Sequence, residues 1–571
     1  YPWSTCQKAP SVAVTRGWGS CCLMVYLGNN ASQAANNPAQ EILRQQERER
    51  VLREQQETHP DLRFPAPVMP AQTPLPSDES PCFTINTFEL TGTDADTFAW
   101  ALKEADFAKG HCLGTKGLNI VMSRIQNAIM ARGFVTTRVL AAPQDLTHGA
   151  LTLVVVPGRV RHIVFAPNTN ARATAWNAVP ARRGDILNLR DIEQALENFK
   201  RLPTVDADIQ ITPAEGGDAQ PGESDLVITW QQRSPPVRVS ASFDDAGSKT
   251  TGKMQGSATL SLDDLVALND LFYINVNHDL FNGNNKGTRG YTAHYSLPYG
   301  YWSLGTTLSG YEYRQTVAGA RQHYLYRGTS NNAEVRLSRV LYRDAVRKSG
   351  AYISGWKRRS DNFIDDTEVE VQRRRTGGWT LGLTHREYLG ASTLDGNLGY
   401  RRGTGAFDAM AAPEELFGEG TSRMALITAD VELMTPFTLG TQSLRYTGNV
   451  RTQWDRTPLV PQDRFSIGGR YSVRGFDGEL TLMGERGWVW RNELGLALGA
   501  GQSVYLGADY GHVGGNSTRW LNGRDLAGAV IGLRGGMSGF AWDLFVGGPL
   551  HKPEGFQTSA LTTGFNVNWS Y

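Results

Sequence analysis

Residues 271–300 have the sequence LFYINVNHDLFNGNNKGTRGYTAHYSLPYG, and this stretch decides the fold class. Apolar and polar residues alternate over two short runs, as a β-strand with one apolar and one wet face requires. The apolar positions are Phe272, Ile274 and Val276, then Tyr291, Ala293, Tyr295 and Leu297. A long turn at residues 282–287 and a tight turn at Pro298-Tyr299-Gly300 bound the second run. The pattern predicts neighbouring antiparallel strands.

The same alternation continues through residues 236–571, where no helical periodicity of useful length occurs. It ends in a C-terminal run formed by Phe565, Val567, Trp569 and Tyr571. At about 10 residues per membrane-spanning strand plus loops, this length allows roughly 16 strands around a water-filled lumen. The sequence therefore predicts a mainly β protein, with a transmembrane antiparallel β-barrel at residues 236–571. A soluble β-sandwich or propeller is the competing class.

Composition excludes a helical membrane protein. The 571 residues have a mean hydropathy of −0.36, and no run of about 18 apolar residues is present. A barrel remains compatible, since only alternate residues of its strands face lipid. The 57 Lys and Arg residues nearly balance the 56 Asp and Glu residues, so bulk charge predicts no nucleic-acid partner.

Residues 1–36 have the outline of an export leader. A short apolar run from Cys21 to Leu27 follows Lys8 and Arg16, but the run is short for a signal peptide. A remnant of a tag or a trimmed sequence is an equally good interpretation. Three of the five cysteines, Cys6, Cys21 and Cys22, lie in this leader.

Residues 37–58 form a predicted helix that is charged on nearly every side. Asn37 is a candidate N-cap followed by Pro38 at the first helical position. The charged positions include Glu41, Arg44, Glu47, Arg48, Arg50 and Arg53. A helix without a broad apolar stripe gains little by packing on a core, so it needs water around it. A solvated N-terminal segment is the simple alternative, but a water-filled lumen would also suit it, which predicts a plug.

A proline-rich tether at residues 59–81 leads to two small domains, at residues 82–158 and 159–235. Each is predicted as a β-α-α-β-β unit with helices on one face of a three-stranded sheet. The first has an apolar helix face at residues 118–129 and strands at 134–140 and 151–156. The second has strands at 160–165, 205–211 and 226–230 and a helix at 192–199. Free sheet edges accept extended peptides by strand addition, although both domains could also be spacers.

Cys82 and Cys112 would close a loop of about thirty residues, worth roughly 3 to 4 kcal/mol in the chain-entropy model. We expect them to be paired in an oxidising periplasm, whereas two buried thiols would be expected in the cytosol.

Enzymatic motifs are missing from the sequence. No H-E-x-x-H, Walker-type or C-x-x-C pattern occurs, and the 10 histidines are scattered. We therefore predict no catalytic site, metal or cofactor. A hydrolase built on the barrel wall remains a weaker alternative.

The order of helix, tether, two small domains and large barrel resembles the outer-membrane transporters of two-partner secretion, the TpsB family of the Omp85 superfamily. Val473-Arg474-Gly475-Phe476 look like the family signature at the tip of an inward-folded loop near residues 465–482. Asp509-Tyr510-Gly511 resembles the inward-facing acidic strand motif, although Gly507 stands where an aromatic residue is common. That departure weakens the expected anchor of the loop. Cys82, Cys112 and residues 133–138 are similar to the haemolysin and contact-dependent inhibition (CdiB-like) exporters.

The resemblance implies two POTRA-like domains in the periplasm and a pore in the Gram-negative outer membrane. The implied cargo is an unfolded TpsA/CdiA-like exoprotein such as an adhesin, haemolysin or inhibition toxin. The other implied partners are outer-membrane lipid and the barrel-assembly machinery, for which the last strand is the assembly signal. The transporter is expected to be a monomer. An insertase of the same superfamily and a plugged passive pore are the alternatives.

Asp509 is the predicted partner of Arg474, because an unpaired cation beside a low-dielectric wall is costly. Gly475 would permit the turn between Arg474 and Phe476. The alternative is that both charges merely line a wet lumen.

Overall fold

The computed structural model describes residues 38–57, 60–64, 73–283 and 285–571. The leader with Cys6, Cys21 and Cys22, and the proposed N-cap at Asn37, lie outside these residues.

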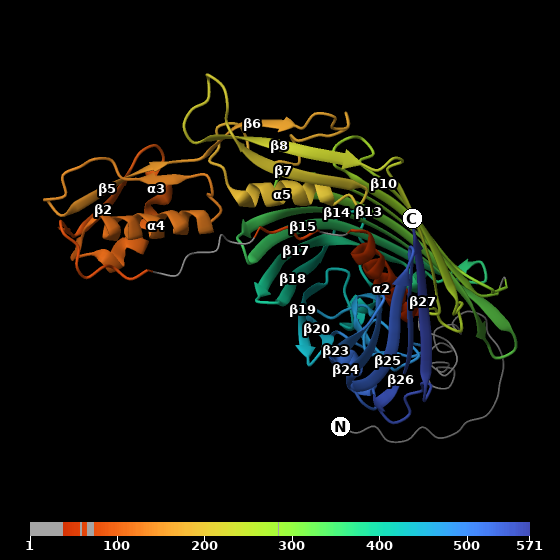
Figure 1. Ribbon diagram of the computed structural model, residues 1–571. Coiled ribbons are helices and arrows are strands. Elements are labelled where there is room, and N and C mark those ends of the chain that lie inside the picture. Colours follow the sequence, from red (N-terminus) through yellow and green to blue (C-terminus); the bar gives the residue numbers. More distant parts are fainter. Residues whose placement is uncertain (1–37, 58–59, 65–72, 284) are drawn as a thin grey trace.

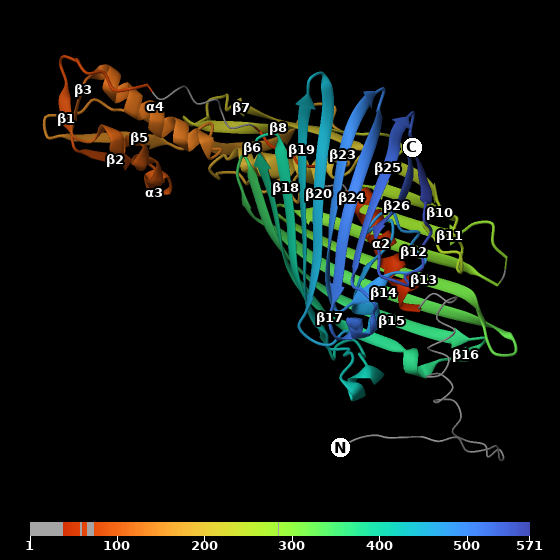
Figure 2. The ribbon, with the colours of Figure 1, turned by 90° about the horizontal axis from the view of Figure 1, so that it is seen from below.

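The C-terminal part is a closed antiparallel β-barrel of 16 membrane-sized strands (Figures 1 and 2). The two-residue strand β16 pairs only with the end of β15, which pairs directly with β17. The ring closes where β27 pairs with β9, so the predicted barrel is confirmed. The 16 membrane-sized strands, with the short β16 in its place along the chain, are β9 (Val237–Asp244), β10 (Gln255–Asp263), β11 (Leu271–Asp279), β12 (Gly287–Tyr299), β13 (Trp302–Ala318), β14 (His323–Arg343), β15 (Arg347–Ile364), β16 (Thr367–Glu368), β17 (Arg374–Leu389), β18 (Ser392–Thr404), β19 (Ala425–Leu439), β20 (Gln442–Asp455), β23 (Arg486–Gly499), β24 (Gln502–Gly514), β25 (Asp525–Met537), β26 (Phe540–His551) and β27 (Thr562–Ser570).

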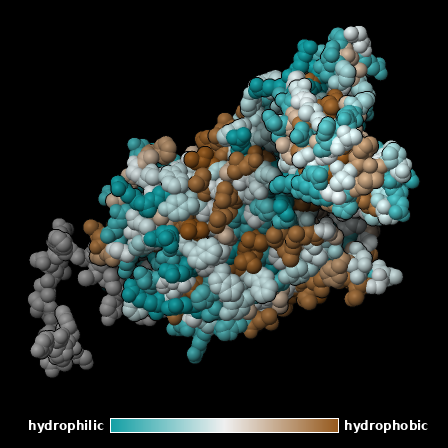
Figure 3. All heavy atoms as spheres, turned by 90° about the vertical axis from the view of Figure 1, so that its left-hand side faces the viewer, coloured by the Kyte–Doolittle hydropathy of each residue, from teal (hydrophilic) through white to brown (hydrophobic). Residues whose placement is uncertain are grey.

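Burial in the barrel is reversed relative to a water-soluble protein. In β11, Ile274 and Val276 are exposed on the outside, whereas Tyr273 and Asn275, which alternate with them, are buried toward the lumen. Apolar side chains gather in patches on the outer face of the barrel (Figure 3). This is the alternation that a wall between lipid and a polar interior requires. Among the described helices, none has the length and apolar composition to cross a membrane.

The first small domain packs a three-stranded sheet, in the order β2-β5-β4, against its helices. Its elements are β1 (Phe83–Ile85), β2 (Thr87–Thr91), α3 (Ala95–Phe98), the 3-10 helix η1 (Ala99–Ala108), β3 (His111–Leu113), α4 (Thr115–Ala131), β4 (Arg138–Leu140) and β5 (Ala150–Val156). Ile125 and Ile129 of α4 are completely buried against Leu151 and Leu153 of β5. Cys82 and Cys112 form a disulfide beside the β1–β3 pair.

The predicted strand at residues 134–140 is too long at its start. Gly133 has a φ of 99°, and the turn that follows it is closed by a hydrogen bond from the Thr137 N–H to the Phe134 carbonyl (3.3 Å). Strand pairing therefore begins only at Arg138.

The second small domain contains β6 (Arg159–Phe165), α5 (Leu189–Lys200), β7 (Val205–Pro213) and β8 (Glu223–Gln232). Its sheet has the order β6-β8-β7 and packs on α5 through Ile192, Leu196 and Phe199. The expectation of two helices in this domain was wrong, because residues 166–188 contain no helix. Pro167 and Pro180 restrict the backbone there, and Asn168 and Gly184 take positive φ angles of 65° and 90°, which a helix does not accommodate.

Removing the disulfide should destabilise the first small domain selectively. The bond spans 30 residues, so Cys82→Ser with Cys112→Ser should lower the domain's free energy of unfolding by about 3 to 4 kcal/mol. Protease cleavage of the domain during a thermal ramp measures this change. The wild type treated with reductant should behave like the double variant, whereas equal protease resistance of the oxidised and variant proteins would contradict the expectation.

Candidate functional site

The loop between β20 and β23 folds back into the barrel. It contains the 3-10 helix η4 (Pro461–Asp463) and a short hairpin of β21 (Phe465–Ile467) and β22 (Leu482–Gly484). Val473 and Phe476 are buried in one apolar cluster with Ile467 and Leu482. Phe476 also meets Phe556 edge-on, with ring centroids 5.9 Å apart. The cluster also contains Val489, Val513 and Leu526 of the wall, so the loop shares a small apolar core with the barrel.

Arg474 points from this loop to the wall, where it meets Asp509 of β24. Its Nε donates to Asp509 Oδ2 (2.7 Å), its Nη2 donates to Oδ1 (2.9 Å), and its backbone N–H donates to Oδ2 (2.9 Å). The Asp509 side chain is fully buried. Fork-shaped, charge-assisted contacts of this kind fix orientation as well as charge. One carboxylate therefore holds both the side chain and the backbone of the loop tip.

Glu493 of β23 is a second acid at this point. Arg474 Nη1 donates to Glu493 Oε2 (2.6 Å), and Arg534 of β25 also pairs with Glu493. Sequence reasoning missed both residues. Strand register could have found Glu493. It lies four residues after the inward-facing Val489, so its side chain faces the lumen too, and it pairs with Gly507 of β24.

Glycines make room for the loop at three places. Gly475 has a φ of 95°, and a Cβ there would lie 2.4 Å from the Gly548 carbonyl oxygen, so an L side chain would be strained. A Cβ on Gly507 would lie 2.6 Å from Arg474 Nη2, and one on Gly511 would lie 2.8 Å from Val473 Cγ2. The guanidinium of Arg474 thus occupies the space that a side chain at residue 507 would take.

The helix α2 (Pro38–Gln56) runs through the lumen (Figure 2). Near its N-terminus, Glu41 accepts a hydrogen bond from the Tyr311 hydroxyl of β13 (2.6 Å). Arg44 pairs with Glu41 and donates to the Gly478 carbonyl of the inward loop (2.7 Å). Ile42 packs on Tyr311. The helix therefore contacts both the wall and the inward loop.

Further along α2, charged side chains pair with the wall on several sides. Glu47 meets Arg451 of β20 (2.7 Å), Arg48 meets Asp244 of β9 (3.2 Å), and Arg53 lies 3.8 Å from Glu334 of β14. Arg50 differs, because its ion pairs within the described residues are with Glu47 and Glu54 of the helix itself. Charged side chains on several sides of α2 thus have polar partners in the wall or in the helix itself.

The C-terminal end of α2 reaches the edge of the barrel nearest the small domains. Gln56 accepts from Ser261 (3.3 Å) and Glu57 accepts from Tyr273 (3.1 Å). A cavity of about 1040 Å³ lies beside this half of the helix. Its lining includes Arg53 and Glu57, Glu197 and Arg201 of the second small domain, and wall residues such as Arg336.

The C-terminal strand forms the seam of the barrel. Phe565, Val567 and Trp569 lie in β27, and Tyr571 exchanges backbone hydrogen bonds with Val239. The pairing with β9 spans only residues 566–570. Arg470 of the inward loop contacts Asp245 and the Phe565 carbonyl next to it.

Within the described residues, no group of three or more His, Cys, Asp or Glu side chains could hold a metal ion. The site is thus a lumen filled by a helix and a loop, joined to two small domains.

Three family models match the chain. The haemolysin secretion/activation protein family ShlB/FhaC/HecB matches residues 222–535. The ShlB-type POTRA domain matches residues 83–158, and a further POTRA model matches residues 159–213.

Curated relatives and solved structures agree with this match. The outer membrane transporter CdiB-2 of Burkholderia pseudomallei (strain 1026b) is 38% identical over 565 residues, covering 94% of this chain and 95% of the relative. The structure of CdiB from Acinetobacter baumannii has a TM-score of 0.82 and 34% identity, covering 93% of this chain and 98% of that chain. CdiB from Escherichia coli has a TM-score of 0.84 and 25% identity, covering 94% and 100%.

Two findings assign the chain to a family. The family model covers more than half of the chain, and a relative is 38% identical over nearly all of it. The chain belongs to the haemolysin secretion/activation family ShlB/FhaC/HecB, the outer-membrane transporters of two-partner secretion that export partner proteins across this membrane.

Proposed function

We propose that this transporter binds an unfolded exoprotein of the contact-dependent inhibition type with its two POTRA domains and passes it through the lumen as an extended chain. The similarity to CdiB transporters over nearly the whole length supports this choice of cargo. The transporter acts as a conduit and not as an enzyme. It works as a monomer, is surrounded by outer-membrane lipid, is inserted by the barrel-assembly machinery through its last strand, and binds no nucleic acid.

The observation that carries the proposal is the way α2 is held. Its contacts with the wall are ion pairs and hydrogen bonds spread along the helix, and water can replace each of them. The side chains of these ion pairs are 15% to 35% exposed, so removing one partner leaves a charge that water can reach, at a lower cost than for a fully buried pair. The helix is therefore a removable plug, and its departure opens a path through the lumen.

The inward loop has the opposite character. Arg474 is buried with Asp509 and Glu493, and breaking a buried pair by removing one partner costs about 3 to 5 kcal/mol. The loop tip, Val473 to Phe476, thus acts as a fixed support for the plug and for the wall around it, since Gly478 of the same loop accepts from Arg44.

Replacing Arg474 should stop export and leave a folded barrel. Arg474→Ala leaves Asp509 and Glu493 without their shared cation, so the loop tip should leave the wall. The measurements are the exoprotein in the culture medium and the heat-modifiable migration of the barrel on a gel. Arg519→Ala, on the exposed 3-10 helix η5 (Asn516–Trp520), is the matched control. Normal secretion by Arg474→Ala would disprove the role of the pair.

Removing the plug should enlarge the channel. Deletion of residues 37–57 should convert a small, flickering current across a planar bilayer into a large, steady one. Arg48→Ala should raise the open frequency about fivefold, if the lost contact is worth about 1 kcal/mol.

Arg50→Ala is the control for this experiment, because Arg50 pairs within the helix, and it should gate like the wild type. A deletion with unaltered current would show that the helix does not close the channel.

A further inference from the structure

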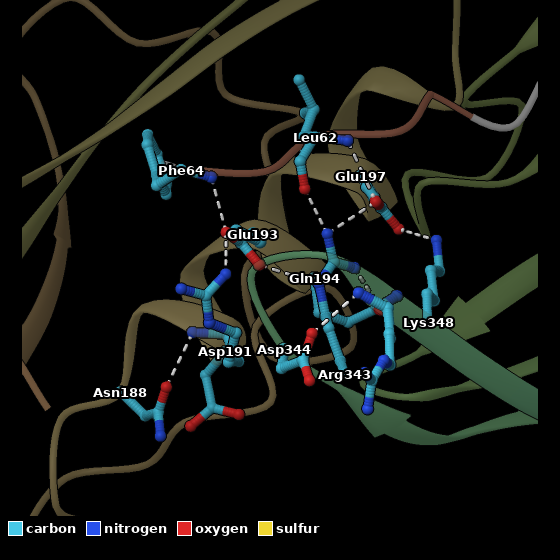
Figure 4. A network of polar contacts seen from close by, with 12 residues as sticks. Leu62, Phe64, Asn188, Asp191, Glu193, Gln194, Glu197, Arg343, Asp344 and Lys348 are labelled. Carbon is cyan, nitrogen blue, oxygen red and sulfur yellow. Dashed lines mark hydrogen bonds and ion pairs between the residues drawn. The ribbon is translucent and has the colours of Figure 1, made fainter. Parts of the chain in front are cut away.

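Linker residues 61–64 lie between the second POTRA domain and the rim of the barrel (Figure 4). Alternate side chains face opposite ways. Leu62 and Phe64 pack against the apolar core of the domain. Asp61 lies 3.7 Å from Arg386, and the Arg63 guanidinium lies 3.4 Å from the ring centroid of Tyr388, both on β17. This alternation is that of an extended chain.

The backbone of this segment is bound by two acids of α5. The Leu62 N–H donates to Glu197 Oε1 (3.1 Å), and the Phe64 N–H donates to Glu193 Oε1 (2.6 Å). Residues four apart on a helix are separated by about 6 Å along its axis, and alternate residues of an extended chain by about 6.6 Å. The spacing of the two carboxylates therefore matches the spacing of alternate N–H groups in an extended chain. The acceptors at the edge of a β-sheet have a similar spacing.

The acids are held in place from the barrel. Arg343, at the end of β14, donates through Nε to Glu193 Oε2 (2.9 Å) and through Nη2 to Glu197 Oε1 (2.8 Å). Lys348 of β15 pairs with Glu197 as well. Burial opposes the charge on Glu197, but Arg343 and Lys348 outweigh it and keep the pKa of this carboxyl below its usual value. The two acceptors are thus held in place by groups that do not belong to the linker.

Arg343 also binds the linker itself, since its Nη2 donates to the Leu62 carbonyl. The Arg343 and Glu193 side chains are only 4% and 0% exposed. We call Glu193, Gln194, Glu197, Arg343 and Lys348 the linker site. The site offers two carboxylate acceptors and one guanidinium donor to a main chain. These polar contacts are with backbone atoms, so they depend little on which side chains the bound segment carries.

We propose that the linker site also binds the main chain of the exported protein, and that residues 61–64 occupy it while the channel is plugged. The ligand is an unfolded, extended polypeptide with apolar side chains at alternate positions. The inference rests on the proposed function and deepens it. Glu197 and Gln194 line the cavity beside the C-terminal half of α2, so a chain bound here is already at the entrance to the lumen. Displacing the linker also releases the segment that leads from the plug to the first POTRA domain.

The test uses the full chain with Leu62→Pro and Phe64→Pro. Proline has no N–H, so this variant empties the linker site without changing its five residues. The probe is a fluorescent acetylated peptide amide with the sequence of residues 60–64, PDLRF. Its polarisation should show binding to the double variant at least tenfold tighter than to the wild type, where the tethered linker competes at a high effective concentration. Equal affinity for both proteins would overturn the proposal.

Backbone methylation of the peptide identifies the contacts. Methyl groups on the leucine and phenylalanine nitrogens should each weaken binding tenfold or more, since each removes a hydrogen bond to a charged group. A methyl group on the arginine nitrogen is the matched control and should leave the affinity unchanged, because within the described residues that N–H makes no hydrogen bond with the linker site. Equal effects at all three positions would overturn main-chain recognition.

A third comparison separates cargo from linker. A peptide with valine and isoleucine in place of leucine and phenylalanine should bind within about tenfold of the linker peptide, and one with aspartate at both positions should not bind. Binding of the linker peptide alone would show an internal contact only and overturn the cargo assignment. Peptide binding to purified protein is measured independently of export. Failure of the peptide to bind, with normal secretion by the wild type and none by Arg474→Ala, would overturn this inference alone. Normal secretion by Arg474→Ala would instead contradict the proposed function, whatever the peptide result.

Discussion

Closure of the barrel is the constraint on which the other features depend. A strand in lipid must pair every N–H and C=O with a neighbour, and only a ring has no unpaired edge. Once β27 pairs with β9, the residues of each strand alternate between lipid and lumen. Ile274 and Val276 face the apolar side, and Asn275 faces the interior. The lumen is therefore lined by polar side chains, and the segments that fill it must be polar too.

The lumen is filled by two elements, the inward loop and the helix α2, which are held in different ways. The inward loop concentrates its ionic contacts at one fully buried point, Asp509, next to a small apolar core. The helix α2 distributes its contacts along its length, from Glu41 to Gln56. A concentrated, buried contact resists removal because the remaining charge would have no partner. Dispersed contacts, most of them between partly exposed charges, allow replacement one at a time. This difference in burial supports the proposal that the loop is a fixed support and the helix a removable plug.

The sequence predicted those parts of the structure that repeat or that stand out locally. Alternation marked the barrel, and charge on every side marked a helix that needs a wet environment. Segments that break these repeating patterns could not be predicted as well. Prolines and left-handed residues replace the second expected helix at residues 166–188. The Arg343, Glu193 and Glu197 cluster could not be predicted, because a turn of the barrel and a helix of the second POTRA domain meet only in the fold. Glu493 was within reach through register, but only once the pairing of β23 with β24 was known.

The polar surface of α2 also bears on how the channel responds to its surroundings. A helix that moves from one aqueous space to another exposes little apolar surface, with Ile42 its main buried apolar contact. Exposure of apolar surface is what gives protein transitions a large heat-capacity change. The balance between plugged and open states should therefore vary gently with temperature. Salt screens the contacts that do change, so a rise in ionic strength should favour the open state.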